Sequence, residues 1–133
     1  MTAAMKTITV EGANIHDITS LYDELNRVFM SGEDWKLGTS LDAFNDLLYG
    51  GFGAIEGGEH ISLVWNCFAH TAQALGADAT REWYKEKLKK PDLFNKEIIG
   101  EKLTALERGH GQTYFDIILE IIADHKNIEL VPR

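Results

Sequence analysis

Cysteine is almost absent from this sequence, since Cys67 is the only one among 133 residues. An internal disulfide and a paired-cysteine metal site are therefore excluded. The apolar surroundings of Cys67 in the sequence favour an inert buried thiol over a nucleophile. Long hydrophobic runs are also absent, whereas a membrane-spanning helix needs about 20 consecutive apolar residues. Residues 1–10 lack the apolar core of a secretory signal, so we expect a soluble cytoplasmic protein.

Positive charge is scarce in the first part of the chain. Residues 1–60 contain ten acidic and three basic side chains, whereas residues 61–133 contain eleven acidic and ten basic ones, for a net charge of −8. A field of this sign repels nucleic acid and anionic membranes and attracts cationic surfaces. We therefore expect neither nucleic acid nor a membrane as a direct partner.

The length and the apolar content of 44% predict a single domain, residues 1–133, with one core. Segments 6–10, 61–65 and 128–131 are rich in β-branched residues and predict strands. Segment 61–65 is apolar at nearly every position, which is typical of a central strand buried on both faces. Helical patterns separate the three segments, so we expect an α/β fold with a parallel sheet. Residues 1–4 are expected to be a loose end.

Two further helices carry informative polar residues. Thr19 is expected to cap a helix with Asp23, Glu24 and Arg27 in water and an apolar side of Leu21, Leu25, Val28 and Phe29. Thr113 is expected to begin the last helix. This helix combines a wide apolar side with an acidic stripe of Asp116, Glu120 and Asp124, which by itself is as consistent with solvated surface as with a binding site.

The most informative stretch is residues 35–53. Thr39 or Ser40 can cap a helix start and Gly50 can end a helix, so a helix is predicted from about 41 to 49. Leu41, Phe44, Leu47 and Leu48 give it a core-facing side. Asp42, Asn45, Asp46 and Tyr49 lie at i, i+3, i+4 and i+7 on the opposite side.

The two aspartates of this polar side are spaced unfavourably. Carboxylates four residues apart on a helix repel each other by about 0.2–0.5 kcal/mol, although Asp42 in the first turn recovers part of this from the helix dipole. A solvated surface is one interpretation of the pair Asp42 and Asp46. A binding surface is the other.

Residues 38–48, with the pattern G-x-x-L-D-A-x-x-D-x-L, resemble the loop and second helix of the barstar family. Barstars are small intracellular inhibitors of the secreted ribonuclease barnase. The resemblance continues through residues 8–25, where the strand, the turn and the helix start follow the family spacing without a gap. It covers about the first half of the chain and the last twenty residues.

The resemblance implies a barstar-like fold, with a three-stranded parallel sheet in the order 2-1-3 and at least four flanking helices. Residues 78–112 depart from the family pattern and become charged and helical. We interpret this segment as an extra helical hairpin or broken helix inserted at one edge. It is either a packing embellishment or a second contact surface.

The resemblance also implies a function, a proteinaceous ribonuclease inhibitor or immunity protein. Asp42 and Asp46 would occupy the phosphate positions of a cationic nuclease or nuclease toxin domain, while Gly38 permits close approach. Barstars carry aromatic contact residues where this chain has Lys36, Leu37 and Asn45, which implies a partner related to but different from barnase. The expected contact residues are Trp35, Lys36, Gly38, Thr39, Asp42, Asn45, Asp46, Tyr49 and Glu120, with Trp35 or Tyr49 as the aromatic anchor.

Three points stay open. Glu120 is the nearest match to a family glutamate on the last helix, although a shift of one turn selects Asp116 or Asp124. A regulatory or structural module that has lost nuclease binding is the main alternative function. A small enzyme using His60, His70, His110 or His125 is less favoured, because these histidines follow no known catalytic or metal-binding spacing. No cofactor or metal is expected, and the oligomeric state and the identity of the nuclease are not predicted.

Overall fold

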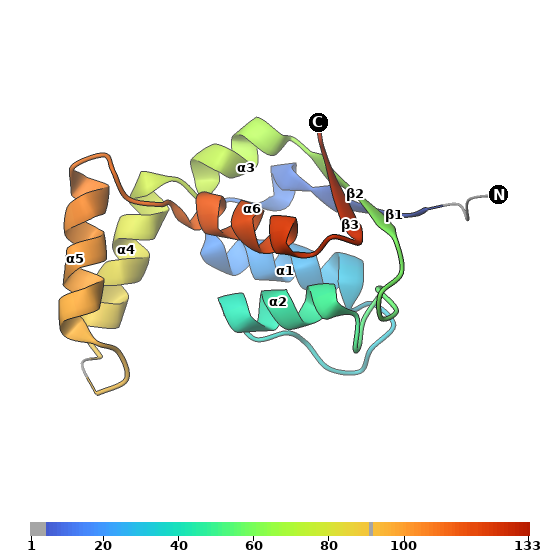
Figure 1. The fold of residues 1–133 in the computed structure, drawn as a ribbon, viewed down its shortest axis with the longest axis horizontal. Helices are drawn as coiled ribbons and strands as arrows, with labels where there is room; N and C mark the ends of the chain where they lie inside the picture. The colour runs from blue at the N-terminus through green and yellow to red at the C-terminus, as the bar shows by residue number, and fades with distance from the viewer. Residues whose placement is uncertain (1–4, 91) are drawn as a thin grey trace.

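A computed structural model describes residues 5–90 and 92–133, so the expected loose end at residues 1–4 lies outside the described residues. Strands β1 (Lys6–Glu11), β2 (Ile61–Asn66) and β3 (Ile128–Pro132) form one parallel sheet (Figure 1). Strand β2 lies between β1 and β3, as its apolar run predicted. The order 2-1-3 is wrong. The alternation of exposed Thr7 and Thr9 with buried Ile8 and Val10 fits an edge strand with one face toward solvent.

Six α-helices and a short 3₁₀-helix lie between the strands in the described part of the chain. They are the 3₁₀-helix Gly12–Asn14, α1 (Ile18–Phe29), α2 (Leu41–Tyr49), α3 (Phe68–Ala74), α4 (Ala77–Leu88), α5 (Lys96–Glu107) and α6 (Tyr114–Asp124). The predicted α/β class is confirmed. No helix of the described segments is long and apolar enough to cross a membrane.

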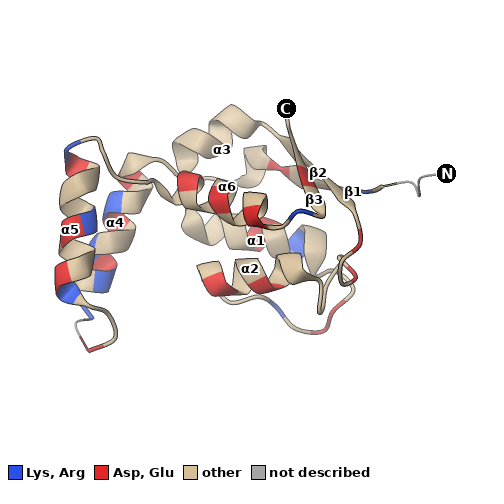
Figure 2. Cartoon of the chain, viewed as in Figure 1, with Lys and Arg blue, Asp and Glu red and all other residues tan. Residues whose placement is uncertain are grey.

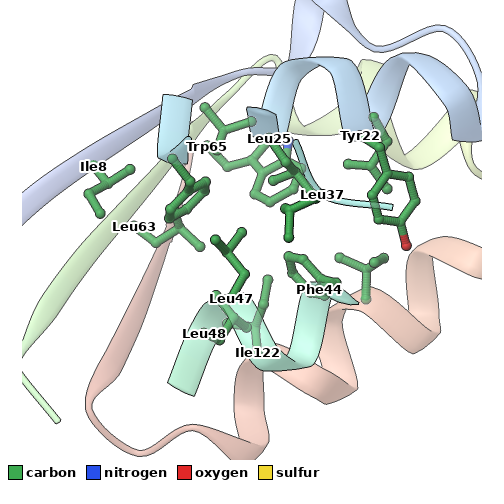
Figure 3. Packing of buried hydrophobic residues seen from close by; sticks show 14 of the residues in the cluster. Ile8, Tyr22, Leu25, Leu37, Phe44, Leu47, Leu48, Leu63, Trp65 and Ile122 are labelled. Carbon is green, nitrogen blue, oxygen red and sulfur yellow. The ribbon is translucent and has the colours of Figure 1, made fainter. Parts of the chain in front are cut away.

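The main core lies where α1, α2 and α6 meet the sheet. Figure 3 shows Leu25, Phe44, Trp65 and Ile122 converging from these elements. Helices α4 and α5 form a hairpin that extends from this body (Figure 1). A separate small cluster of Tyr84, Ile99 and Leu106 holds the hairpin together, so its packing is largely its own.

The start of α1 differs from the expected one. Asp17, not Thr19, is the N-cap, because its side chain accepts a hydrogen bond from the Ser20 N–H at 2.8 Å. The Ser20 hydroxyl in turn accepts from the Asp17 N–H at 2.9 Å. This capping box satisfies two backbone donors at once, which a threonine cap alone does not.

Glu24 on α1 is buried, with only 3% of its surface exposed, and does not stay in water as expected. Its carboxylate accepts hydrogen bonds from the Glu11 N–H, from Asn14 Nδ2 and from the guanidinium of Arg27, at 2.6–3.1 Å. Burial by itself raises the pKa of Glu24, but these hydrogen bonds outweigh burial, so the pKa is lowered. The carboxylate therefore ties α1 to the end of β1.

Cys67 is exposed, which corrects the expectation of a buried thiol. It follows β2 directly and has a left-handed backbone, with φ of 52°, where the chain turns into α3. The strand's apolar pattern therefore ends before Cys67. In α5 two neighbouring apolar residues differ in burial, since Ile98 is 49% exposed and Ile99 is buried.

Candidate functional site

The loop before α2 is fixed to the body at Leu37. The Leu37 side chain is buried, and its backbone N–H donates to Asn26 Oδ1 of α1 at 2.7 Å. Figure 3 shows Leu37 pointing into the core beside Phe44. Because both the side chain and the backbone N–H of Leu37 are held by the body, its exposed neighbours Lys36 and Gly38 lie on a supported loop.

Trp35 lies at the outer edge of this loop. Its side chain is 46% exposed, and its ring packs against Phe52, with 4.8 Å between the centroids. Phe52 belongs to the glycine-rich segment after α2. The indole is therefore supported from one side and accessible from the other, as an aromatic contact residue requires.

Helix α2 has the bounds and the two faces that its sequence predicted. The Ser40 hydroxyl accepts from the Ala43 N–H at 3.1 Å, and Gly50 ends the helix with φ of 83°. Phe44, Leu47 and Leu48 are fully buried. The opposite face carries Asp42, Asp46 and Tyr49, all exposed, and the partly exposed Asn45. The buried face holds the polar face rigidly against the body.

Asn45 is held by His125, a contact that the sequence did not reveal. The Nε2 of His125 donates to Asn45 Oδ1 at 2.7 Å, since this oxygen can only accept. The His125 ring is buried and meets the Tyr49 ring edge-on, with 4.6 Å between centroids. The carbonyl of Asn45 is therefore used within the molecule, and its amide group is what remains for a partner.

Helices α2 and α6 lie side by side and are parallel. Asp42 and Tyr114, near the two helix starts, line the same hollow, whereas Asn45 contacts His125 at the end of α6. Neither helix contains Lys or Arg. In Figure 2 the charged residues of these two helices are all acidic, whereas α4 and α5 carry both signs. We refer to Asp42, Asp46, Asp116, Glu120 and Asp124 as the acidic face.

The carboxylates of the acidic face differ in their internal partners. Asp116 accepts from the Thr113 N–H at 2.9 Å, and Glu120 accepts from Gln112 Nε2 at 2.6 Å. Within residues 5–90 and 92–133, no hydrogen bond reaches the carboxylates of Asp42, Asp46 and Asp124. No carboxylate of the acidic face forms an ion pair in the same ranges. The negative charge of this surface is therefore not neutralised by the chain itself.

All nine expected contact residues thus have a described position. Trp35, Lys36, Gly38, Thr39, Asp42, Asp46, Tyr49 and Glu120 are exposed, and only Asn45 is partly covered. Thr39 and Asp42 share a hollow with Tyr114 at the start of α6, whereas Trp35 and Lys36 line a separate hollow beside α1. Over the described ranges, no group of three His, Cys, Asp or Glu side chains is arranged to hold a metal ion.

Comparison with known proteins identifies the family. A search of curated proteins gave no match. The sequence profile of the family described as "Barstar (barnase inhibitor)" matches residues 5–90. The matched range contains β1, α1, the loop, α2 and β2, and it ends inside the segment 78–112. That this segment is an insertion stays a prediction, as does the role of α6. Because the match covers well over half of the sequence, the chain belongs to the barstar family.

Proposed function

We propose that this protein inhibits a cationic ribonuclease or nuclease toxin domain by covering its active site. The observation that carries the proposal is the unneutralised acidic face on α2 and α6, beside a supported loop, in a member of the barstar family. A ribonuclease cleaves a polyanion, so its active site presents cations where the phosphates lie. An acidic protein surface competes for the same cations.

Asp42 and Asp46 are suited to occupy phosphate positions. Both carboxylates are exposed and one turn apart on the same side of α2, whose opposite side is fixed in the core. Charge-assisted hydrogen bonds from Lys or Arg to such carboxylates are among the strongest available at an interface. Because the helix is already ordered, little conformational entropy is lost on binding.

The aromatic contacts are proposed to come from Trp35 and Tyr49. Leu37 is buried and the Asn45 carbonyl is held by His125, so these positions do not present the aromatic rings that barstars carry there. Tyr49 belongs to the polar face and is 65% exposed, and Trp35 lies in the loop before α2 and is 46% exposed. Aromatic anchors supply much of the energy at interfaces, so a changed anchor supports a nuclease different from barnase.

An inhibitor of this kind acts in the cytoplasm, either against the cell's own secreted enzyme or against a toxin domain delivered by a neighbour. Both nucleases present the same kind of cationic site. The changed anchor positions are also the observation that favours the second candidate, a regulatory or structural module of barstar fold that no longer binds a nuclease.

Titration of the purified protein into cationic ribonucleases, including barnase and any encoded beside it, tests the proposal. We expect one-to-one loss of RNA cleavage that Asp42→Ala/Asp46→Ala does not produce. The matched control is Glu97→Ala/Glu101→Ala, which removes two exposed carboxylates with the same spacing from α5. If neither the wild type nor the control inhibits any nuclease of the panel, the regulatory or structural module is favoured.

The single variants rank the two aspartates. Asp46 lies nearer the middle of the polar face, whereas Asp42 is at its edge in the first turn of α2. We expect Asp46→Ala to weaken inhibition by at least about thirtyfold, corresponding to about 2 kcal/mol, and Asp42→Ala to weaken it less. Equal losses in the measured inhibition constants contradict this ranking.

A further inference from the structure

A hollow of about 470 Å³ separates the first turn of α2 from the hairpin of α4 and α5. Ser40 and Asp42 line its α2 side, and Trp83, Lys87 and Phe94 line its hairpin side. The Trp83 ring packs edge-on against the Tyr114 ring at the start of α6, with 4.8 Å between centroids. The hollow therefore has walls from the body and from the hairpin.

Lys87 is held in this hollow by two aromatic rings. Its Nζ lies 3.9 Å from the centroid of the Trp83 ring and 5.0 Å from that of Phe94. Burial, with a smaller contribution from the nearby Lys102, lowers the pKa of Lys87. The rings stabilise the ammonium group by cation–π contact but do not neutralise it.

Lys87 and the neighbouring Lys90 lack an acidic partner. Among the described residues, neither forms an ion pair, although Lys85 pairs with Glu82 and Lys89 pairs with Glu86 on the same helix. Asp42 and Glu86 line the same hollow, but neither carboxylate is within ion-pair distance of Lys87 or Lys90, because Glu86 pairs with Lys89 instead. On the hairpin side of the hollow, the ammonium groups of Lys87 and Lys90 therefore have no ion-pair partner in the described part of the chain.

The acidic face and the hollow are continuous, because Asp42 belongs to both. Along this surface the charge changes sign, from the carboxylates of Asp46 and Asp42 to the ammonium groups of Lys87 and Lys90. A nuclease surface that is positive throughout would match the first part and repel the second. A complementary partner needs one negative group at a fixed position beside its cations.

We infer that the hollow receives an acidic side chain of the inhibited nuclease, an Asp or Glu at the rim of its cationic active site, which pairs with Lys87 and Lys90. This inference rests on the proposed function and adds a requirement on the partner. The hairpin then selects among nucleases, since those without a rim carboxylate leave Lys87 facing positive charge. A nuclease is a more complementary occupant than a second copy of this chain. To place a carboxylate in the hollow, a second copy would have to bring its own acidic face close to the acidic face of the first.

The test compares Lys87→Gln/Lys90→Gln with Lys96→Gln/Arg108→Gln. The control removes two exposed cations from the other face of the hairpin, where they line a separate groove. Both pairs change the net charge equally, so any general effect of charge on steering cancels. We expect the hollow variant to inhibit about tenfold more weakly than the control at low salt. Circular dichroism and urea unfolding confirm that both variants are folded.

Substitutions in the nuclease itself give the sharper test. Acidic residues at the rim of the nuclease active site are replaced singly by the corresponding amide, and each variant is titrated with wild-type inhibitor and with the hollow variant. One replacement should weaken inhibition by the wild type and leave inhibition by the hollow variant unchanged, which is the signature of a direct pair. If every rim substitution changes inhibition by the wild type and by the hollow variant equally, no direct pair exists and the inference is overturned.

The failures of the two proposals are distinguishable. If Asp42→Ala/Asp46→Ala loses inhibition while the hollow variant matches its control, the hollow plays no part and only this inference falls. If no nuclease is inhibited by the wild type, both fall. Sedimentation tests whether a second copy of this chain occupies the hollow. A dimer that Lys87→Gln/Lys90→Gln dissociates would place a second copy there and overturn the inference, whereas a monomer supports it.

Discussion

Helices α2 and α6 carry charge of one sign, whereas the hairpin of α4 and α5 carries both signs (Figure 2) and pairs several of its charges with each other. On the hairpin, Arg81 pairs with Asp78 at 2.8 Å and also with Glu107 across the two helices. Paired surface charges need no other molecule, and their effect on stability is small. Like charges gathered without counter-charges carry a cost in stability, which binding of a cationic partner relieves.

The same two regions differ in burial. The body has a large core that includes fully buried Phe44, Leu47, Leu48 and Trp65, whereas the buried residues of the hairpin cluster are Tyr84, Ile99 and Leu106. Stability therefore resides mainly in the body that presents the acidic face. We therefore expect substitutions in the hairpin cluster to leave the acidic face in place.

Core truncation should separate the two regions most strongly. Phe44→Ala removes a fully buried ring from the face of α2 that packs on the body, and we expect it to lower the free energy of unfolding by about 3–5 kcal/mol. Leu103→Ala removes a partly buried side chain from the hairpin cluster and should cost about 2 kcal/mol or less. Urea unfolding measures both, and equal losses would show that the hairpin is as much a part of the core as α2.

Glu24 tests a buried charge of the body. Glu24→Gln should lower the free energy of unfolding by about 1–3 kcal/mol, because it removes the charge from a carboxylate held by several hydrogen bonds. The pKa of Glu24 is lowered in the folded protein, so its stabilisation is present above the unfolded value of 4.5 and is lost as the pH falls through the folded value. The free energy of unfolding, measured between pH 7 and pH 3, should therefore fall less in the variant than in the wild type as the pH is lowered. An identical pH dependence in the two proteins contradicts this assignment.

The tyrosine pair tests the contact between α1 and α6, next to the point where the hairpin joins the body. The hydroxyls of Tyr22 and Tyr114 are buried and 2.6 Å apart, and Tyr114 also contacts Trp83 of α4. A double-mutant cycle with Tyr22→Phe and Tyr114→Phe should give a coupling of about 1 kcal/mol.

The same pair predicts a loss of stability in alkali. Burial raises the pKa of both tyrosines, that of Tyr114 to about 12, from an ordinary value of 10. Their stabilisation is therefore complete below pH 10 and declines as the pH rises toward the folded values. The double phenylalanine variant should lack this decline in unfolding experiments above pH 10, and a decline of the same size in the variant would assign it to other groups.

The surface pairs of the hairpin should have the smallest effect. Arg81→Ala removes the ion pairs with Asp78 and Glu107, but these are exposed and screened by solvent. We expect the midpoint of thermal unfolding and the inhibition constant to stay at the wild-type values. A lower unfolding midpoint or a higher inhibition constant would show that these ion pairs stabilise the protein or its complex, contrary to this expectation.

Local sequence determined what could be predicted. Ser40 and Gly50 bound α2 as expected, because caps act on their own backbone, and the continuous apolar run placed β2 at the centre of the sheet. The family-based strand order did not use that run and was wrong. The cap at Asp17 depended on its pairing with Ser20, which a choice of Thr19 alone overlooked.

Long-range contacts could not be predicted. Glu24 is buried because Glu11, Asn14 and Arg27 converge on it, and its polarity alone suggested exposure. The hydrogen bond between Asn45 and His125 joins residues 80 positions apart. The hollow with Lys87 likewise requires α2 and the hairpin to meet, whereas the sequence showed only a mixed charge in segment 78–112.

Amide hydrogen exchange on the free chain, and on the chain bound to the nuclease that it inhibits most tightly, shows directly which surface is covered. We expect slower exchange on binding in residues 35–49 and in α6, with the outer face of α5 and the exposed side of β1 unchanged. Unchanged exchange in α2, with new protection confined to the sheet or to α5, would contradict the claim that the acidic face is the inhibitory surface.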